Sequence, residues 1–227
     1  MLRGDSPVAP KQHSEPNPDM TDSRPKVTGV GRFAFGSLVE PGKNLNGHPE
    51  WCCALQLDMK ASEPLINLVA EYIDAGYKQY GDLWPKKSES LNVPYKQATK
   101  PAGDGTDKRV ADPDNLLWKI TRNGKVNRNG AQVDNTPPQI ISGSGKVLRP
   151  EQIPNIGFGS TGVAIFLPAV YSYAGQHGVK FRLVGFQIAE LKEGGALPEL
   201  APIEGGWTPA EDGDAAVDLA ALVGAAS

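Results

Sequence analysis

The sequence has few of the residues that build disulfides and metal sites. It contains two cysteines, Cys52 and Cys53, and three histidines, His13, His48 and His177. Neighbouring residues of a strand point to opposite faces, so a disulfide between the two cysteines would be strained. These five residues also show no recognisable zinc-binding spacing. We therefore expect no metal, no cofactor and a reducing, intracellular environment.

Long apolar runs and catalytic motifs are missing as well. No segment approaches the roughly 20 apolar residues of a membrane helix, and the opening residues MLRGDSPVAPKQHSEP lack the apolar core of a secretion signal. The sequence holds no Gly-x-Ser-x-Gly elbow, no HExxH motif and no pair of carboxylates within one short motif. It therefore predicts neither an enzyme nor a membrane protein.

Glycine, proline and an uneven charge distribution characterise what is present. With 26 glycines, 20 prolines and 39% hydrophobic residues, the 227-residue chain suits one loop-rich β or α+β domain with tails. Positions 21–192 carry 21 Lys and Arg against 16 Asp and Glu, whereas positions 193–227 carry seven acids and no Lys or Arg. A basic body with an acidic tail suits a polyanion that competes with the tail. An ordinary surface beside a solvated tail fits the charges equally well.

Alternating apolar residues predict four strands before the C-terminal part of the basic region, at positions 27–38, 51–59, 116–122 and 139–142. Phe33 and Phe35 should share one face of the first strand. Helical spacing begins at Ser62, a favourable N-cap residue, and ends at Gly81. Positions 82–114 hold many residues that break helices and strands, and we predict a long loop insertion there.

The C-terminal part of the basic region predicts a long β-hairpin. Two runs rich in β-branched and aromatic residues, 163–173 and 179–191, flank the turn Ala174–Gly178. Lys180 and Arg182 alternate there with apolar residues, which places charge on one face of the sheet. Because no catalytic acid, base or nucleophile gathers on this hairpin, it favours binding over chemistry.

The order of these elements predicts a mainly β fold of the α+β class. We expect an OB-type closed barrel of five to six strands with one capping helix. The barrel is assigned to residues 27–192, with disordered tails at 1–26 and 193–227. Such a barrel holds single-stranded nucleic acid when it offers a basic groove for the backbone and aromatic platforms for the bases.

The candidate interface consists of cations for phosphates and aromatic rings for bases. The expected phosphate contacts are Arg32, Lys119, Arg122, Lys125, Arg128, Lys146, Arg149, Lys180 and Arg182. The expected stacking residues are Tyr171 and Tyr173, which lie beside the hairpin turn where burial is least complete, and Trp118. Arg122, Lys125 and Arg128 recur every three residues around Asn-Gly turns, where they could clamp phosphates or only solubilise a turn.

The hairpin region also carries a recognisable motif. Ile156-Gly157-Phe158-Gly159-Ser160 leads into the first strand, Tyr171 and Tyr173 end it, Val179-Lys180-Phe181-Arg182-Leu183 begins the second, and Glu190-Leu191 closes it. This pattern, with Phe35-Gly36 and the order of elements from Val27 to Lys192, resembles phage-encoded single-stranded-DNA-binding replication proteins. The resemblance implies an OB-fold that coats single-stranded DNA without sequence preference. It places the protein in phage replication and recombination, in the cytoplasm of an infected bacterial cell.

The resemblance further implies an acidic C-terminal tail that occludes the DNA groove and contacts a phage or host polymerase or helicase. In this sequence the resemblance assigns that role to the tail acids Glu211, Asp212, Asp214 and Asp218. Unlike the family's tails, this one ends without an aromatic residue. A homodimer and weaker binding of duplex DNA stay open.

Two other functions fit the sequence. A phage structural or assembly protein would use the barrel for protein contacts, with Val163, Ile165 and Leu167 covered by a partner chain. A nucleic-acid enzyme would need a metal cluster among the acids from Asp104 to Asp114.

Overall fold

The computed structural model describes residues 24–192, except positions 86–89, 104, 107 and 174. The predicted tails lie outside these residues, apart from positions 24–26, and so do the four tail acids expected to contact partners. Within the described part of the chain, no helix is both long and apolar enough to cross a membrane.

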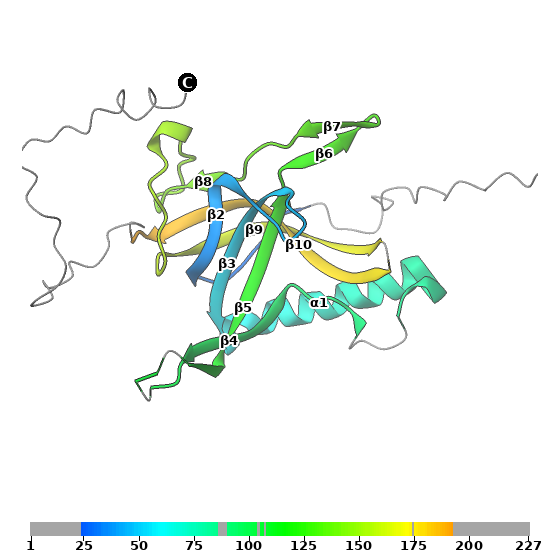
Figure 1. Ribbon diagram of the computed structural model, residues 1–227, viewed down its shortest axis with the longest axis horizontal. Coiled ribbons are helices and arrows are strands. Elements are labelled where there is room, and N and C mark those ends of the chain that lie inside the picture. The colour runs from blue at the N-terminus through cyan, green and yellow to red at the C-terminus, as the bar shows by residue number, and fades with distance from the viewer. Residues whose placement is uncertain (1–23, 86–89, 104, 107, 174, 193–227) are drawn as a thin grey trace, which may run out of the picture. The chain divides into compact units, whose positions relative to one another are not determined.

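The elements of the described residues follow one another along the chain as Figure 1 shows. They are β1 (Lys26–Val27), β2 (Gly31–Lys43), β3 (Pro49–Asp58), α1 (Met59–Tyr80), β4 (Tyr95–Pro101), β5 (Arg109–Asn123), β6 (Lys125–Arg128), β7 (Ala131–Asp134), β8 (Gln139–Ile141), β9 (Thr161–Tyr173) and β10 (Gln176–Glu190).

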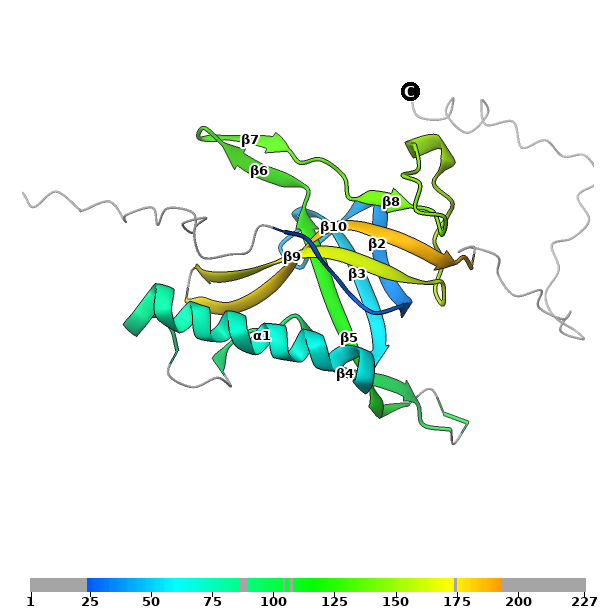
Figure 2. The same ribbon diagram turned by 180° about the vertical axis from the view of Figure 1, so that it is seen from behind.

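Five strands pair into a closed ring in the order β9, β2, β3, β5 and β10, and the antiparallel β9–β10 hairpin completes it (Figures 1 and 2). β1 pairs with β9, β8 pairs in parallel with β10, and β4 pairs with β5. β6 and β7 form a separate hairpin, whose tip residues Asn129 and Gly130 both have positive φ, as in a type I′ turn. The predicted mainly β, OB-type α+β class is confirmed.

Helix α1 lies across one end of the ring and packs against β3, β5, β9 and β10. Its N-cap is Asp58, whose Oδ1 accepts a hydrogen bond from the Ala61 amide at 2.7 Å, and it ends at Gly81, where φ is +53°. The prediction of Ser62 as the N-cap is wrong. Asp58 takes that position one turn earlier, and Ser62 is buried on the face that packs against the sheet.

The core of the ring contains a stack of aromatic rings. Trp118, Phe181 and Phe166 follow one another with ring centroids 5.6 and 4.1 Å apart. Trp118 is 0% exposed, and its Nε1 donates a hydrogen bond to Ser62 Oγ at 3.0 Å. The prediction that Trp118 stacks on bases is therefore wrong. Its pairing with the buried Leu55 of β3 turns the indole into the core.

The stretch 82–114 is not the long loop that the sequence predicts. β4 pairs antiparallel with the part of β5 from Arg109, where β5 begins, to Trp118. Ala98 is the one buried residue of β4, so the strand shows no alternation of apolar residues for sequence reasoning to detect. The β4–β5 hairpin extends beyond the ring at the lower left of Figure 1.

A bulge in β2 separates two phenylalanines that strict alternation assigns to one face. Phe33 pairs with Leu55 and Phe35 with Ala54, so the register shifts between them. Phe33 lies in the core, whereas Phe35 is 51% exposed. The prediction that they share a face is wrong, because one extra residue in a strand reverses the side that the next side chain takes.

Candidate nucleic-acid interface

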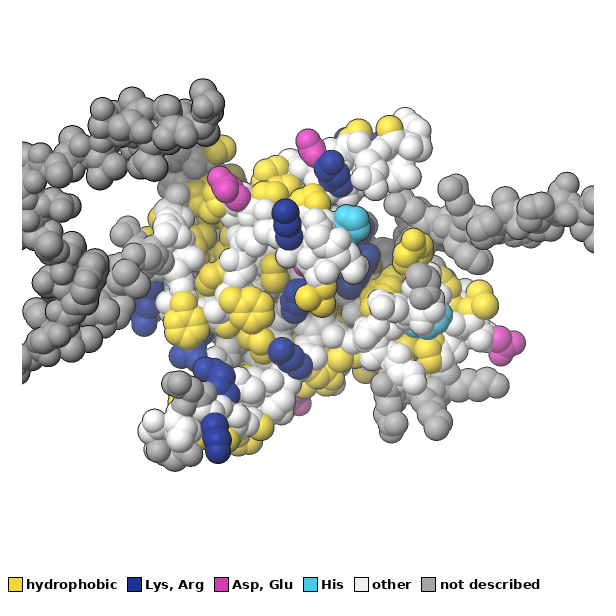
Figure 3. Space-filling model, viewed as in Figure 1, with side chains coloured by type: hydrophobic (Ala, Val, Ile, Leu, Met, Phe, Trp, Pro, Cys, Tyr) yellow, Lys and Arg dark blue, Asp and Glu magenta, His cyan; other side chains and the backbone are white. Residues whose placement is uncertain are grey.

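A groove of about 480 Å³ crosses the outer face of the sheet between β2 and the β4–β5 hairpin. Figure 3 shows hydrophobic side chains beside Lys and Arg over these elements. The lining includes three cations, two amides and two aromatic rings: Arg32, Lys96, Arg109, Gln56, Gln97, Phe35 and Phe158.

Strand register explains why residues distant in sequence meet in this groove. Arg32 of β2 pairs with Gln56 of β3, Gln56 pairs with Leu117 of β5, and Leu117 pairs with Lys96 of β4. Residues directly opposite each other on antiparallel strands share a face. This row of four side chains therefore points outward across four strands.

Phe158 stands at the rim of the groove on a tightly held turn. The amide of Gly157 donates to the Lys192 carbonyl oxygen at 2.8 Å, and the amide of Gly159 donates to the Phe33 carbonyl oxygen at 2.9 Å. Gly159 has a φ of +87°, which a residue with a side chain rarely adopts. Since both neighbours are hydrogen-bonded to distant parts of the chain, the backbone at Phe158 is held in place while the ring remains 68% exposed.

The cations of the groove are held by neighbouring groups. The Arg32 guanidinium carbon is 5.6 Å from the centre of the Phe158 ring. Arg109 donates from Nε to Thr99 Oγ1 at 2.9 Å and from Nη2 to the Thr99 carbonyl oxygen at 2.6 Å. A guanidinium has five N–H donors, so each arginine keeps donors for an anionic ligand.

One acidic side chain lies beneath the groove, and its neighbours compensate its charge. The Asp112 side chain is 7% exposed and lies 3.5 Å from Lys100 Nζ. A hydrogen bond from Asn115 Nδ2 at 2.9 Å outweighs the effect of burial and lowers the pKa of Asp112. The carboxylate is therefore ionised at neutral pH, and its charge is directed into the protein.

Four of the predicted phosphate contacts lie on exposed positions of the same sheet, on β2, β5 and β10. Arg32 lies in the groove itself. Arg182 of β10 pairs with Thr121 of β5, and two residues before them in the same two strands come Lys180 and Lys119. All four cations are exposed.

Arg122 does not belong to this exposed set. Its Nη1 donates to the Leu183 carbonyl oxygen at 3.2 Å, its Nη2 donates to Asn135 Oδ1 at 3.3 Å, and burial lowers its pKa. The three cations are thus divided between two elements, because Arg122 lies in β5 and bridges to β10 while Lys125 and Arg128 lie on β6. A common clamp on phosphates stays a prediction.

The remaining predicted cations are exposed on elements outside the groove. Lys125 and Arg128 lie on β6, which leaves the ring in Figure 1, and Lys146 and Arg149 lie on the segment that follows β8. A contact between these residues and a nucleic acid stays a prediction.

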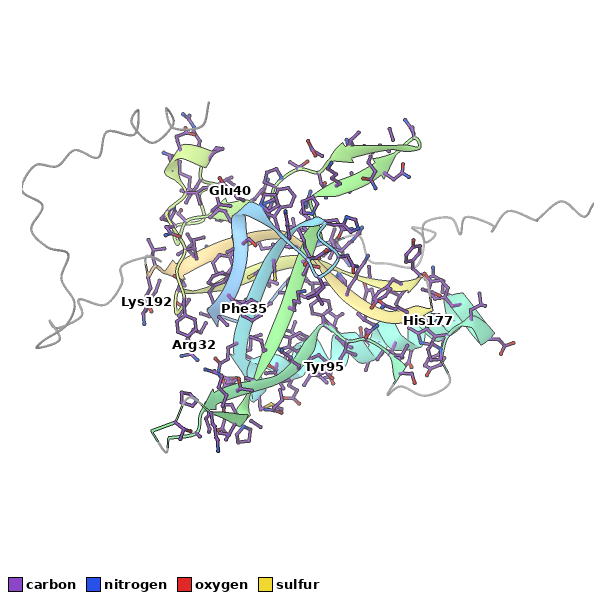
Figure 4. All side chains as sticks on the ribbon, in the orientation of Figure 1. Arg32, Phe35, Glu40, Tyr95, His177 and Lys192 are labelled. Carbon is purple, nitrogen blue, oxygen red and sulfur yellow. The ribbon has the colours of Figure 1, made fainter. Side chains whose placement is uncertain are left out.

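The two predicted tyrosine platforms lie at the tip of the β9–β10 hairpin, which we call the hairpin tip (Tyr171–Lys180). Tyr173 is 80% exposed, and Lys180 Nζ is 5.6 Å from the centre of the Tyr171 ring. Figure 4 separates His177 of this tip from Arg32 across the width of the described fold. The predicted residues thus divide between two distant regions.

Sequence reasoning missed four residues of the groove, namely Phe35, Phe158, Lys96 and Arg109. The bulge in β2 conceals the exposure of Phe35, and the two cations fall in the stretch predicted as a loop. The glycines on either side of Phe158 are the one signal that could have identified it, since they permit a turn that exposes the ring.

Two observations on the described residues concern the alternative of an enzyme. Among these residues, no three His, Cys, Asp or Glu side chains gather in a way that could hold a metal ion. Asp104 and Asp107, two acids of the alternative metal cluster, lie outside the described residues. Burial raises the pKa of the Cys52 thiol to about 11, so this thiol is protonated and weakly nucleophilic at neutral pH.

Comparison with known proteins gives a match in structure alone, because the chain matches no protein-family model and no curated protein. The fold is similar to gp2.5, a single-stranded DNA binding protein encoded by bacteriophage T7, with a TM-score of 0.56 and 15% identity over 82% of this chain and 99% of that chain. It is also similar to the single-stranded DNA-binding protein from bacteriophage Enc34 in complex with ssDNA, with a TM-score of 0.52 and 15% identity over 76% of this chain and 90% of that chain. The likeness shows a shared fold, the one that the resemblance in sequence implies.

Proposed function

We propose that this chain binds single-stranded DNA without sequence preference in the groove between β2 and the β4–β5 hairpin. The observation that carries the proposal is the groove itself, where Arg32, Lys96 and Arg109 surround two exposed phenyl rings. The fold supports it, because the similar Enc34 protein was solved in complex with single-stranded DNA. The biological role we infer is the coating of single-stranded DNA in phage replication and recombination, inside an infected bacterial cell and without catalysis.

The groove supplies both contacts that a single strand needs. Cations along the walls bind the phosphates, and this term weakens as salt competes for them. The faces of Phe35 and Phe158 are exposed to stack on bases, and stacking contributes roughly 1–3 kcal/mol per base. Lys119, Lys180 and Arg182 extend the path of the backbone along β5 and β10.

Internal hydrogen bonds support the absence of sequence preference. Gln56 Oε1 accepts from Arg32 Nη2 at 2.5 Å, and Gln56 Nε2 donates to Asp112 Oδ2 at 3.3 Å. Gln97 Nε2 donates to the carbonyl oxygens of Asp112 and Asn115. Side-chain amides read bases through such donors and acceptors. Since these amides are engaged within the protein, the groove presents mainly charge and aromatic faces.

The end of the described chain supports a competing tail. The Lys192 amide donates to Ser160 Oγ at 2.9 Å, and its carbonyl oxygen accepts from Ser160 Oγ at 3.0 Å and from Gly157. Lys192 is thereby tied beside Phe158 at the groove rim, and the acidic segment 193–227 begins at the next residue. We propose that this segment competes with DNA for the groove. Its acids Glu211, Asp212, Asp214 and Asp218 are proposed to contact a polymerase or helicase.

Fluorescence anisotropy with a labelled oligothymidylate at two salt concentrations tests the proposal. We expect affinity to fall steeply as salt is raised. In a plot of log affinity against log salt concentration, each phosphate contact should add about 0.7 to the steepness of the slope. A duplex of the same length, titrated in parallel, measures whether the protein also binds double-stranded DNA more weakly. Affinity that is indifferent to salt, or absent below tens of micromolar, would contradict the proposal.

The structure does not favour the alternative of an assembly protein. Val163, Ile165 and Leu167 are already half-buried within the described chain, and β1 pairs with β9 at Ile165. Size-exclusion chromatography with and without oligonucleotide separates the two functions and also reports a homodimer. A stable oligomer that ignores DNA would support the alternative.

A further inference from the structure

A row of polar contacts crosses beneath the groove and joins its two walls. Arg32 Nη2 of β2 donates to Gln56 Oε1 of β3 at 2.5 Å, and Gln56 Nε2 donates to Asp112 Oδ2 of β5 at 3.3 Å. Asp112 Oδ1 then lies 3.5 Å from Lys100 Nζ of β4. The row thus connects four strands through a carboxylate that is almost fully buried.

Asp112 also fixes the place where the β4–β5 hairpin bends away from the ring. The pairing of β4 with β5 skips residues 113–115, which bulge beside Asp112. Its Oδ2 accepts from Asn115 Nδ2 at 2.9 Å, and its Oδ1 accepts from the Asp114 amide at 3.3 Å. One carboxylate therefore receives donors from the bulge on one side and from the groove on the other.

We propose that Asp112 is a positioning residue for DNA binding. It orients the amide of Gln56, and through that amide it holds the Arg32 guanidinium over Phe158, where it meets a phosphate. The inference rests on the proposed function of the groove. An arginine that is held before binding loses less conformational freedom when DNA arrives, so the row contributes to affinity although Asp112 does not touch DNA.

The proposal predicts that neutralising Asp112 lowers the affinity for DNA, whereas an argument from charge alone predicts a higher affinity. An acid near a DNA groove repels phosphates, so its neutralisation should tighten binding. Asp112→Asn instead lowers the affinity for an oligothymidylate by about 3- to 10-fold, because asparagine has one acceptor oxygen where the carboxylate has two. The salt slope should fall by about 0.7, as it does when one phosphate contact is lost.

Asp114→Asn is the matched control. It removes the same charge two residues away, and the Asp114 side chain is exposed in the same bulge. We expect its affinity to stay unchanged or to rise slightly. The decisive comparison is a cycle with Arg32→Ala, in which Asp112→Asn should change affinity by less than about twofold, because its effect passes through Arg32.

Two outcomes would overturn the proposal: tighter binding by Asp112→Asn, as in the control, or an equal loss with and without Arg32. Thermal unfolding of each variant shows that it is folded. If Asp112→Asn does not fold, Gln56→Met replaces it, because it removes both groove hydrogen bonds and leaves the bulge intact. Its loss of affinity should also vanish in the Arg32→Ala background, and a persistent loss counts against the proposal. If the wild-type protein itself binds no single-stranded DNA, the proposed function fails instead.

Discussion

The groove and the hairpin tip both combine cations with exposed aromatic rings, but they hold them differently. In the groove, hydrogen bonds tie the backbone on both sides of Phe158, and Gln56 fixes Arg32 over its ring. Side chains from four strands and two walls surround the ligand space there. At the hairpin tip, Tyr173 is 80% exposed beside a turn, and a single hairpin supplies the rings.

For the proposed function, this difference predicts where a single strand should bind most tightly. Ordering side chains at an interface costs free energy, so groups that are already ordered give more affinity for the same contact. The groove has such groups at Arg32 and Phe158. At the tip, hydrogen bonds join Asn92 to the backbone of His177 and Val179 and Lys180 lies over Tyr171, but the Tyr173 ring is 80% exposed. We therefore expect the groove to carry most of the affinity and the tip to add to it.

The largest effect is expected from removal of both groove rings. Phe35→Ala with Phe158→Ala should weaken binding of an oligothymidylate by at least about 30-fold, since each lost stack costs roughly 1–3 kcal/mol. Both side chains are exposed, so the thermal midpoint should change little. Anisotropy titration measures the loss, and a change below about threefold would place the bases elsewhere.

Removal of the groove arginine should have the next largest effect. Arg32→Ala should lower affinity by about tenfold and reduce the salt slope by about 0.7, because one held phosphate contact is lost. Lys78→Ala is the matched control, because Lys78 is an exposed cation of helix α1 outside the groove, and it should leave the slope nearly unchanged. Equal salt slopes for the two variants would contradict the claim that the groove arginine contacts a phosphate and the control cation does not.

Deletion of residues 193–227 should change affinity in the opposite direction. Removal of the seven acids that come after Lys192 in the sequence should raise affinity at low salt by about fivefold, because the proposed competitor of DNA is lost. In the Phe35→Ala, Phe158→Ala background, deletion of the tail should still raise affinity, but only by the part of the gain that comes from removing negative charge. Equal affinity of the full-length and truncated proteins at low salt would refute competition by the tail.

The smallest effect is expected at the hairpin tip. Tyr171→Ala and Tyr173→Ala should each weaken binding by no more than about threefold, because both rings lie on one hairpin and outside the groove. A loss as large as that of the groove variant would reverse the comparison and restore the tip as the main platform.

Much of the fold follows from the sequence because its signals are local. The long hairpin, the strand at Trp118 and the end of the helix at Gly81 each depend on alternation, helical spacing or a glycine, and the structure contains them. β4 was not predicted, because a strand with one buried residue shows no alternation of apolar and polar residues. The choice between Asp58 and Ser62 as the N-cap depended on where β3 ends.

The site was less predictable because its residues meet through pairing across the sheet. Arg32, Gln56 and Lys96 become neighbours only through the registers of β2, β3, β4 and β5. Trp118 was misassigned because alternation gives two faces but does not say which one is the core. Phe35 was misassigned because a bulge reverses the alternation after Phe33.

The central claim is that single-stranded DNA binds mainly in the groove and less at the hairpin tip. Photo-crosslinking tests this claim most directly. An oligonucleotide containing 5-bromodeoxyuridine is bound to the full-length protein and irradiated, and the crosslinked peptides are identified by mass spectrometry. Our account predicts crosslinks in the peptides that contain Phe35 and Phe158. Crosslinks confined to the peptide with Tyr171 and Tyr173 would contradict it.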